Sequence, residues 1–126
     1  MPAPVVHFEI GSKDSAETAK FYSAVFDWQF ADLGPARLIA AGHEGGPTGM
    51  LSTLGHPPEN YVMVYVQVDD LEATLKRVAE AGGTTMVPPI LLPDGRRFAW
   101  INDTAGNIIG LLTPVPAPNE NPATPG

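Results

Sequence analysis

The sequence predicts an α+β fold made of two consecutive βαβββ modules. One β-rich segment, one amphipathic helix and three short β-rich segments occur in this order twice along the 126 residues. The two candidate helix caps, Asp14 and Asp70, stand 56 positions apart, and the same offset aligns the apolar residues of the two preceding strands. We therefore place module one at residues 5–56, module two at 60–113 and a proline-rich tail at 114–126.

Module one begins with V-V-H-F-E-I at Val5–Ile10, whose alternation predicts a strand. D-S-A-E at Asp14–Glu17 resembles a capping box and starts a helix that runs to about Asp27. The helix has an apolar face made of Ala19, Phe21, Tyr22, Val25 and Phe26. We expect the helix-to-sheet core to consist of Phe21, Tyr22, Phe26 and Trp28. Three short strands separated by glycine and proline follow, within 28–35, 36–42 and 48–55.

Module two repeats this order. Tyr61–Val68 is β-rich, and Asp69 or Asp70 then caps a helix that Gly82 and Gly83 end. Three further strands are predicted within 84–87, 96–101 and 107–112, with turn sequences P-D-G and D-T-A-G-N before the second and the third. The tail is rich in proline and has little to bury, so it is expected to be extended or disordered.

Composition restricts the function classes. Seven Lys and Arg stand against fourteen Asp and Glu, and the resulting net charge of −7 makes nucleic acid and anionic membranes unexpected partners. No run of apolar residues is long enough to span a bilayer, and the N-terminus lacks the basic and apolar regions of a signal peptide. With no cysteine, disulfides and thiolate metal sites are excluded, and a cytoplasmic location is expected.

Five motifs stand in a fixed order along the chain: A-x-F-Y-x-x-V-F-x-W at Ala19–Trp28, V-D-D-L-E-A-T at Val68–Thr74, A-G-G-T at Ala81–Thr84, G-R-R-F-A-W at Gly95–Trp100 and D-x-x-G-N-x-x-G-L at Asp103–Leu111. Together they resemble the vicinal oxygen chelate superfamily, which includes glyoxalase I, extradiol dioxygenases, and fosfomycin- and bleomycin-resistance proteins. The resemblance covers roughly residues 5–113 and depends on the order, spacing and duplication of the motifs.

This resemblance implies two βαβββ modules forming an incomplete barrel around a cleft that holds a ligand. It also implies a homodimer. Metal-dependent members of the superfamily take one ligand from the first strand and one from the last strand of each module, usually His, Gln or Glu.

Strand alternation assigns side chains to the two faces of the sheet. The apolar residues of the first strand of each module should face the helix. Their neighbours should then face the cleft: His7 and Glu9 in module one, and Met63, Tyr65 and Gln67 in module two.

The four metal positions that the resemblance implies are poorly filled. His7 stands at the first, but Met63 stands at its counterpart and Gly110 where a glutamate would be. The last strand of module one offers Met50, Ser52 and Leu54, of which only Ser52 has an oxygen. A divalent ion needs several strong ligands, so we predict no metal and no cofactor. Glu9, or His43 and His56 from loops, could supplement His7 but are not expected to.

The ligand-binding candidates combine apolar bulk with a few polar groups, as small-molecule pockets do: His7, Glu9, Met50, Met63, Tyr65, Gln67 and Trp100. The phase of the strand that carries Trp100 is ambiguous, so Trp100 could instead be core. His7 and Glu9 could act as acid and base, or could hydrogen-bond each other or Tyr65 and only satisfy buried polarity.

Three functions follow from these residues. The first is a metal-free protein that binds a small molecule, as bleomycin-resistance proteins do. The second is a metal-dependent lyase, isomerase or dioxygenase. The third is an interaction module with a vestigial cleft. Catalysis is left open, with His7, Glu9 and Tyr65 as its candidates.

Overall fold

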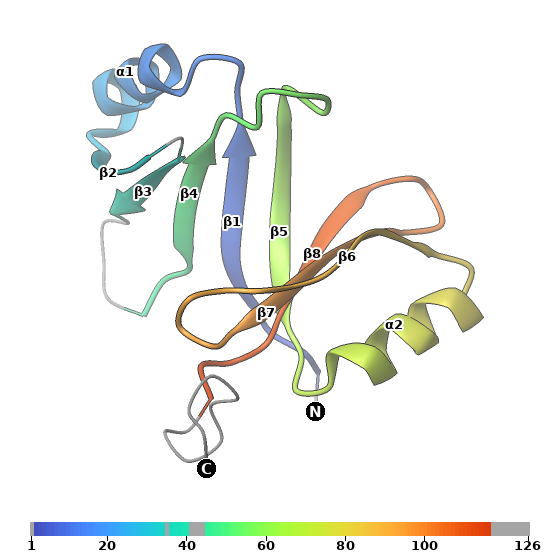
Figure 1. Cartoon of the computed structure of the whole chain (residues 1–126). Helices are drawn as coiled ribbons and strands as arrows, with labels where there is room; N and C mark the ends of the chain where they lie inside the picture. Colours follow the sequence, from blue (N-terminus) through green and yellow to red (C-terminus); the bar gives the residue numbers. More distant parts are fainter. Residues whose placement is uncertain (1, 35, 41–44, 117–126) are drawn as a thin grey trace. The chain divides into compact units, whose positions relative to one another are not determined.

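A computed structural model describes residues 2–34, 36–40 and 45–116, and its elements follow the order strand, helix and three strands twice (Figure 1). The first set is β1 Val5–Gly11, α1 Ser15–Phe26, β2 Gln29–Leu33, β3 Ala36–Ala40 and β4 Thr48–Ser52. The second set is β5 Tyr61–Gln67, α2 Leu71–Glu80, β6 Thr84–Leu91, β7 Arg97–Asn102 and β8 Ile108–Leu112. The predicted α+β class and both βαβββ modules are confirmed.

The chain forms two compact units that divide within β5. One unit spans Val5–Val64, and the other begins at Tyr65 and includes the N-terminal residues up to Pro4. Most of the predicted tail, residues 117–126, lies outside the described residues, and 114–116 form neither helix nor strand. In the part of the chain that is described, neither helix has the length and apolar character needed to cross a bilayer.

In the first unit the strands are hydrogen bonded in the order β2-β3-β4-β1, with the first half of β5 beside β1. β1 and β4 are parallel, whereas β3 is antiparallel to both of its neighbours. Residues paired across two strands project to the same face. The β1–β4 register therefore sets three pairs on one face: His7 with Thr48, Glu9 with Met50, and Gly11 with Ser52.

Helix α1 begins where the capping sequence predicts. The Asp14 carboxylate accepts a 3.2 Å hydrogen bond from the backbone N–H of Glu17. The backbone N–H of Asp14 donates to Ser12 Oγ at 3.1 Å, in place of the glutamate that would complete a capping box. The helix ends at Asp27, which has a left-handed φ of 59° and donates its N–H to the carbonyl of Ser23.

Helix α1 covers one face of the first sheet. The buried core consists of Ala19 from the helix with Ile39 and Leu51 from the strands. Partly buried apolar residues pack around it: Phe8, Ile10, Trp28 and Phe30. The opposite face, which carries His7 and Glu9, is thereby left free of the helix.

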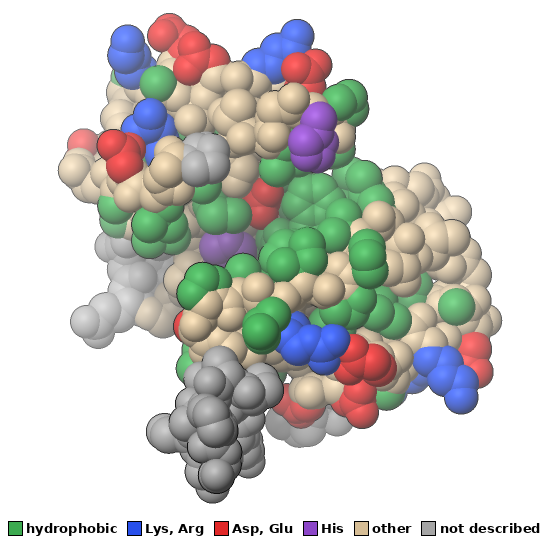
Figure 2. Space-filling model, viewed as in Figure 1, with side chains coloured by type: hydrophobic (Ala, Val, Ile, Leu, Met, Phe, Trp, Pro, Cys, Tyr) green, Lys and Arg blue, Asp and Glu red, His purple; other side chains and the backbone are tan. Residues whose placement is uncertain are grey.

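The predicted apolar face of α1 is wrong for three of its residues. Phe21 and Phe26 are 58% and 55% exposed, and Val25 is similarly open. Tyr22 stacks on Trp28 with ring centroids 5.2 Å apart, and Trp28 in turn contacts Phe8 at the edge of the core. The helix meets the sheet along a narrow stripe through Ala19, so the aromatic residues near its C-terminus pack mainly on one another. Hydrophobic side chains also reach the surface elsewhere on the face that Figure 2 shows.

The second unit repeats the arrangement, with the end of β5 followed by β8, β7 and β6. β5 and β8 are parallel and pair Tyr65 with Gly110, and β7 is antiparallel to β6 and β8. β6 runs to Leu91, beyond the predicted strand, and includes Pro88 and Pro89. An edge strand tolerates proline because its outer N–H groups need no partner, and the pairing with β7 shifts register on either side of Val87.

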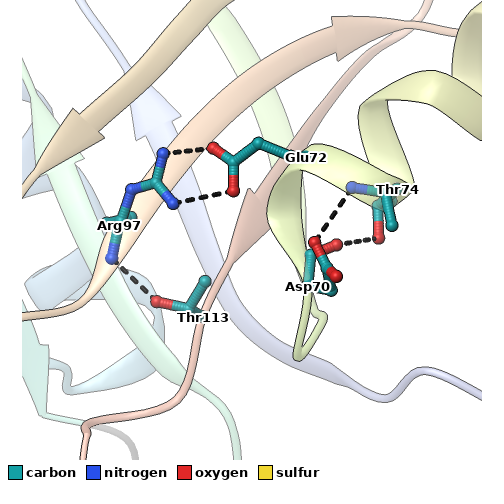
Figure 3. A network of polar contacts seen from close by, with 6 residues as sticks. Asp70, Glu72, Thr74, Arg97 and Thr113 are labelled. Carbon is teal, nitrogen blue, oxygen red and sulfur yellow. Dashed lines mark hydrogen bonds and ion pairs between the residues drawn. The ribbon is translucent and has the colours of Figure 1, made fainter. Parts of the chain in front are cut away.

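Helix α2 is fastened at its start by the network in Figure 3. Asp70, one of the two predicted caps, accepts the backbone N–H of Ala73 at 3.0 Å. The Arg97 guanidinium on β7 donates to both carboxylate oxygens of Glu72, which lowers the pKa of Glu72, and its backbone N–H donates to Thr113 Oγ1 at 2.8 Å. The Arg97 side chain is thus engaged with a carboxylate of the same unit.

We predict that Leu51→Ala destabilises the protein by about 2–5 kcal/mol, because Leu51 is fully buried and its loss leaves a cavity beneath α1. Urea denaturation measures the loss. Leu33→Ala is the matched control, since Leu33 lies in the same unit and is 51% exposed, and it should cost less than about 1 kcal/mol. Equal losses in the two variants would contradict this placement of the core.

Candidate functional site

The face of the first unit opposite α1 carries a row of polar and thioether side chains. β1 supplies His7 and Glu9, and the paired positions of β4 supply Thr48, Met50 and Ser52. Met50 is half-buried, while Ser52 is buried. β-strand alternation produces this row, since residues two apart project to the same side.

A buried carboxylate lies at the centre of this row. Glu9 is only 2% exposed, and the Tyr61 hydroxyl, on β5, donates a hydrogen bond to its Oε2. The ring of Tyr61 lies over Gly11, where an added Cβ would collide with it. Glycine at position 11 therefore makes room for the ring, and the ring in turn brings the hydroxyl to Glu9.

The surroundings raise the pKa of Tyr61 above its usual value. Burial is the largest cause, since it disfavours the charged phenolate, and the hydrogen bond and negative charge of Glu9 act in the same direction. A hydrogen bond with the Ser52 side chain opposes the shift. Tyr61 therefore remains a neutral phenol at physiological pH.

His7 has a different partner from Glu9. Its Nδ1 lies 2.5 Å from Thr48 Oγ1, the directly paired residue on β4. His7 is half-buried and Thr48 is exposed, so this pair stands nearer the surface than Glu9 does. The two polar residues of V-V-H-F-E-I are thus each fixed by a hydroxyl side chain from a neighbouring strand.

In the second unit, Tyr65 and Trp100 lie on the face opposite the core formed by Leu71, Ala99 and Leu111. Trp100 Nε1 donates a 2.8 Å hydrogen bond to the Tyr65 hydroxyl, and both side chains are buried. Trp100 pairs with Gly110, and Gly110 pairs with Tyr65. This register places Trp100 on the same face as Tyr65 and so settles the phase of β7, which was ambiguous from the sequence.

Two other predicted ligand contacts flank Tyr65 on β5. Met63 is 2% exposed, and Gln67 is half-buried. The backbone N–H of Gln67 donates to the carbonyl of Pro4 at 2.8 Å.

The residues at the superfamily's metal positions do not fit a metal. A side chain at Gly110 would need the space that the Tyr65 ring occupies. Met63 offers only a thioether, and Met50 and Ser52 offer a thioether and a buried hydroxyl. Within residues 2–34, 36–40 and 45–116, no group of three or more His, Asp or Glu side chains could hold an ion. His7 is the one strong donor at these positions.

The loop histidines add nothing to this set. His56 is exposed, and its Nδ1 lies 2.8 Å from the carbonyl of the adjacent Pro57. His43 lies outside the described residues.

Tyr61 is the site residue that the sequence reasoning missed. It precedes Met63 and Tyr65 by two and four positions, so the same alternation that placed them on this face also applied to Tyr61. Its partnership with Glu9 spans 52 positions, and no local pattern reports such a contact.

We predict that Tyr61→Phe removes a pH dependence of stability at alkaline pH. A folded-state pKa above the ordinary value of about 10 favours the protonated phenol in the folded protein. The resulting stability is fully present below about pH 10 and is lost as pH rises through the folded pKa. The free energy of unfolding should therefore fall more steeply above pH 10 in wild type than in the variant, as measured by urea denaturation.

Tyr22→Phe serves as the control for this experiment. It makes the same chemical change on α1 and leaves the hydrogen bond between Tyr61 and Glu9 in place, so it should keep the wild-type slope. Identical slopes for all three proteins would contradict a raised pKa of Tyr61 in the folded protein.

Known proteins show the same fold. A methylmalonyl-CoA epimerase of Streptomyces coelicolor, solved with 2-nitronate-propionyl-CoA, superposes with a TM-score of 0.61 at 16% identity, over 92% of this chain and 100% of that one. A hypothetical protein of Bacillus halodurans gives a TM-score of 0.65 at 14% identity, over 90% and 96% of the two chains. At these identities the likeness concerns the fold, which is glyoxalase-like.

Sequence relatives support a closer grouping. A glyoxylase-like domain-containing protein of Didymella fabae is 32% identical over 116 residues, which are 83% of this chain and 89% of that protein. CFP32 of Mycobacterium bovis is 29% identical over 119 residues, and the match spans 42% of its length. The family model described as Glyoxalase/Bleomycin resistance protein/Dioxygenase superfamily matches residues 5–111. The chain therefore belongs to this superfamily.

Proposed function

We propose that this protein binds a small organic molecule without the metal ion of its metal-dependent relatives. The observation that carries the proposal is the ring of Tyr65 over Gly110. An aromatic ring takes the space in which the superfamily's last carboxylate ligand would stand, and Trp100 holds the ring by its hydroxyl. Buried aromatic and thioether groups with a few fixed polar atoms are typical of a site for an organic ligand.

The residues proposed to bind this ligand differ in exposure. His7, Tyr61 and Met50 are half-buried and so can meet a ligand directly, whereas Glu9 and Met63 are buried and shape the site from beneath. Methionine side chains adapt to the shape of a ligand. A homodimer and a cytoplasmic location complete the proposal.

A metal-dependent lyase, isomerase or dioxygenase is the second candidate. One observation favours it, since His7 stands at the first-strand ligand position and is half-buried rather than sealed in a core. The third candidate, an interaction module, is favoured by the exposed Phe21 and Phe26 of α1. Two measurements separate these candidates.

We expect purified protein to contain far less than one divalent metal ion per chain by inductively coupled plasma mass spectrometry. Removing or adding metal should then leave the thermal midpoint of unfolding unchanged. A metal ion that bound only the folded state would raise that midpoint. The assay uses EDTA, Zn²⁺, Ni²⁺, Mn²⁺ and Fe²⁺. One tightly held ion per chain, with a midpoint lowered by EDTA, would replace the proposal by the second candidate.

We expect a metabolite and antibiotic panel that includes bleomycin to contain a compound that raises the midpoint. A compound present at 100 times its Kd should stabilise the protein by roughly 2.7 kcal/mol. A compound bound on the uncovered face of the first unit should lose part of that shift in His7→Ala, which removes a half-buried polar contact. A compound bound on the second unit should lose part of it in Tyr65→Phe, which removes the hydroxyl that accepts from Trp100.

His56→Ala is the matched control for the panel, since His56 is exposed and bonded only to its own loop in the described structure. It should keep the full shift. A panel in which no compound moves the wild-type midpoint would favour the interaction module. A shift that His7→Ala and Tyr65→Phe both leave intact would place the ligand elsewhere.

A further inference from the structure

The two terminal strands, β2 and β6, differ in how well their outer edges are protected against pairing with another strand. β6 carries Pro88 and Pro89, which have no backbone N–H to donate, and its register with β7 shifts on either side of Val87. Such features keep a further strand from adding to an edge. β2 contains no proline and pairs with β3 without a break at all five of its residues. Among the described strands β2 has a neighbour on one side only, so its outer edge offers a regular row of backbone N–H and C=O groups.

Exposed apolar side chains lie on both faces of the sheet beside this edge. On the side of α1, Phe21 and Phe26 are 58% and 55% exposed. Both rings contact Tyr22, which stacks on Trp28, the residue directly before β2. Strand alternation places Leu33, which is 51% exposed, on the opposite side at the end of β2. The open edge is therefore flanked by uncovered apolar surface on both sides.

We propose that β2 pairs with β2 of a second copy of this chain, antiparallel and across a two-fold axis at Ala31, an inference that rests on the homodimer of the proposed function. An antiparallel edge is complementary to itself under a two-fold rotation, so the same strand satisfies both partners. The axis would stand perpendicular to the joined sheet. This places the two α1 helices on the same side of the sheet, where the exposed rings of one copy can cover those of the other.

The side chains beside the axis are compatible with this register. Ala31 would lie opposite Ala31 of the second copy, where two small side chains let the backbones approach. Asp32 would lie opposite Phe30 of the second copy, so the two Asp32 carboxylates would not face one another. Arg37 on β3 forms an ion pair with Asp32 of its own copy, which offsets the charge that Asp32 brings to the interface.

The size of the interface predicts a weak dimer. Side chains that are about half exposed offer on the order of 100 Å² each, so Phe21, Phe26 and Leu33 supply roughly 300 Å² per copy. A stable interface buries about 800 Å² per partner, and β2 adds the backbone of only five residues. We therefore expect a dissociation constant in the micromolar range. In the strand order β3 and β4 separate β2 from β1, so the face of β1 that carries His7 and Glu9 stays outside this interface.

Ala31→Lys tests the interface, because it sets two ammonium groups opposite one another at the axis while it lowers the net negative charge of each copy. Ala31 is exposed, so the variant chain should fold as wild type does. Sedimentation velocity from about 1 µM to 1 mM protein should show a wild-type dimer, and its dissociation constant should rise at least tenfold in Ala31→Lys. Thr85→Lys is the matched control, since it makes the same charge change at an exposed position of β6, and it should dimerise as wild type does.

A second measurement depends on the position of the axis. Ala31→Glu should also weaken the dimer, but an equimolar mixture with Ala31→Lys should form mixed dimers, because opposite charges then meet at the axis. If either charged variant fails to fold, Phe21→Ser decides the matter, since it removes an exposed ring of α1 and should weaken the dimer about fivefold.

Three results would overturn the inference: a wild type that stays monomeric at every concentration, a dimer that Ala31→Lys leaves unchanged, or a mixture that forms no mixed dimer. A monomeric wild type would leave the exposed rings of α1 to a different protein, as in the interaction module. A dimer that Ala31→Lys leaves unchanged would keep the homodimer of the proposed function and place its interface elsewhere.

The binding function is judged separately by the metabolite and antibiotic panel. If a panel compound stabilises a monomeric wild type, the β2 interface is wrong and the binding function stands. If wild type dimerises through β2 while no panel compound stabilises it, the interface stands and the binding function fails.

Discussion

Each half of this protein has one helix to cover a four-stranded arrangement, and this constraint determines the rest of the structure. Ala19 and Leu71, the buried residues of the two helices, each pack on only one face of their strands. The strict alternation of strand side chains then sends His7 and Glu9, or Tyr65 and Trp100, to the opposite face. The face that the helix leaves uncovered is therefore the one that carries the residues proposed to bind a ligand.

The absence of a side chain determines the chemistry at two places on these faces. Tyr61 lies over Gly11, and Tyr65 lies over Gly110. Both tyrosines come from β5 and lie four positions apart, so the same strand face delivers both rings. The substitution of an aromatic ring for a side chain matters more at Gly110. There the Tyr65 ring and its hydroxyl lie where metal-dependent relatives would need a carboxylate. The superfamily fold is thus kept, while a hydrogen-bonded aromatic ring occupies the space beside Gly110.

The polar side chains His7 and Glu9 of the first unit are each fixed by a hydrogen bond. Glu9 is fixed by a phenol and His7 by a threonine hydroxyl, and each bond crosses to a different strand. Such cross-strand bonds restrict the side-chain rotamers, and under the proposed binding function this reduces the entropy lost when a ligand binds. They also separate the roles of two residues that stand only two positions apart. His7 lies nearer the surface, while Glu9 is buried and accepts a hydrogen bond from Tyr61.

The sequence by itself determined the order of the elements, the caps Asp14 and Asp70, and the face on which His7 and Glu9 lie. These features follow from interactions within a few residues and from strand alternation. Only the tertiary structure decided that Tyr61 bonds Glu9, that Tyr65 covers Gly110, and that Phe21 and Phe26 are exposed. The two tyrosine contacts depend on strand register, which brings together residues about fifty positions apart. The exposure of Phe21 and Phe26 depends on the narrow contact between a short helix and the strands. Neither leaves a trace in local periodicity.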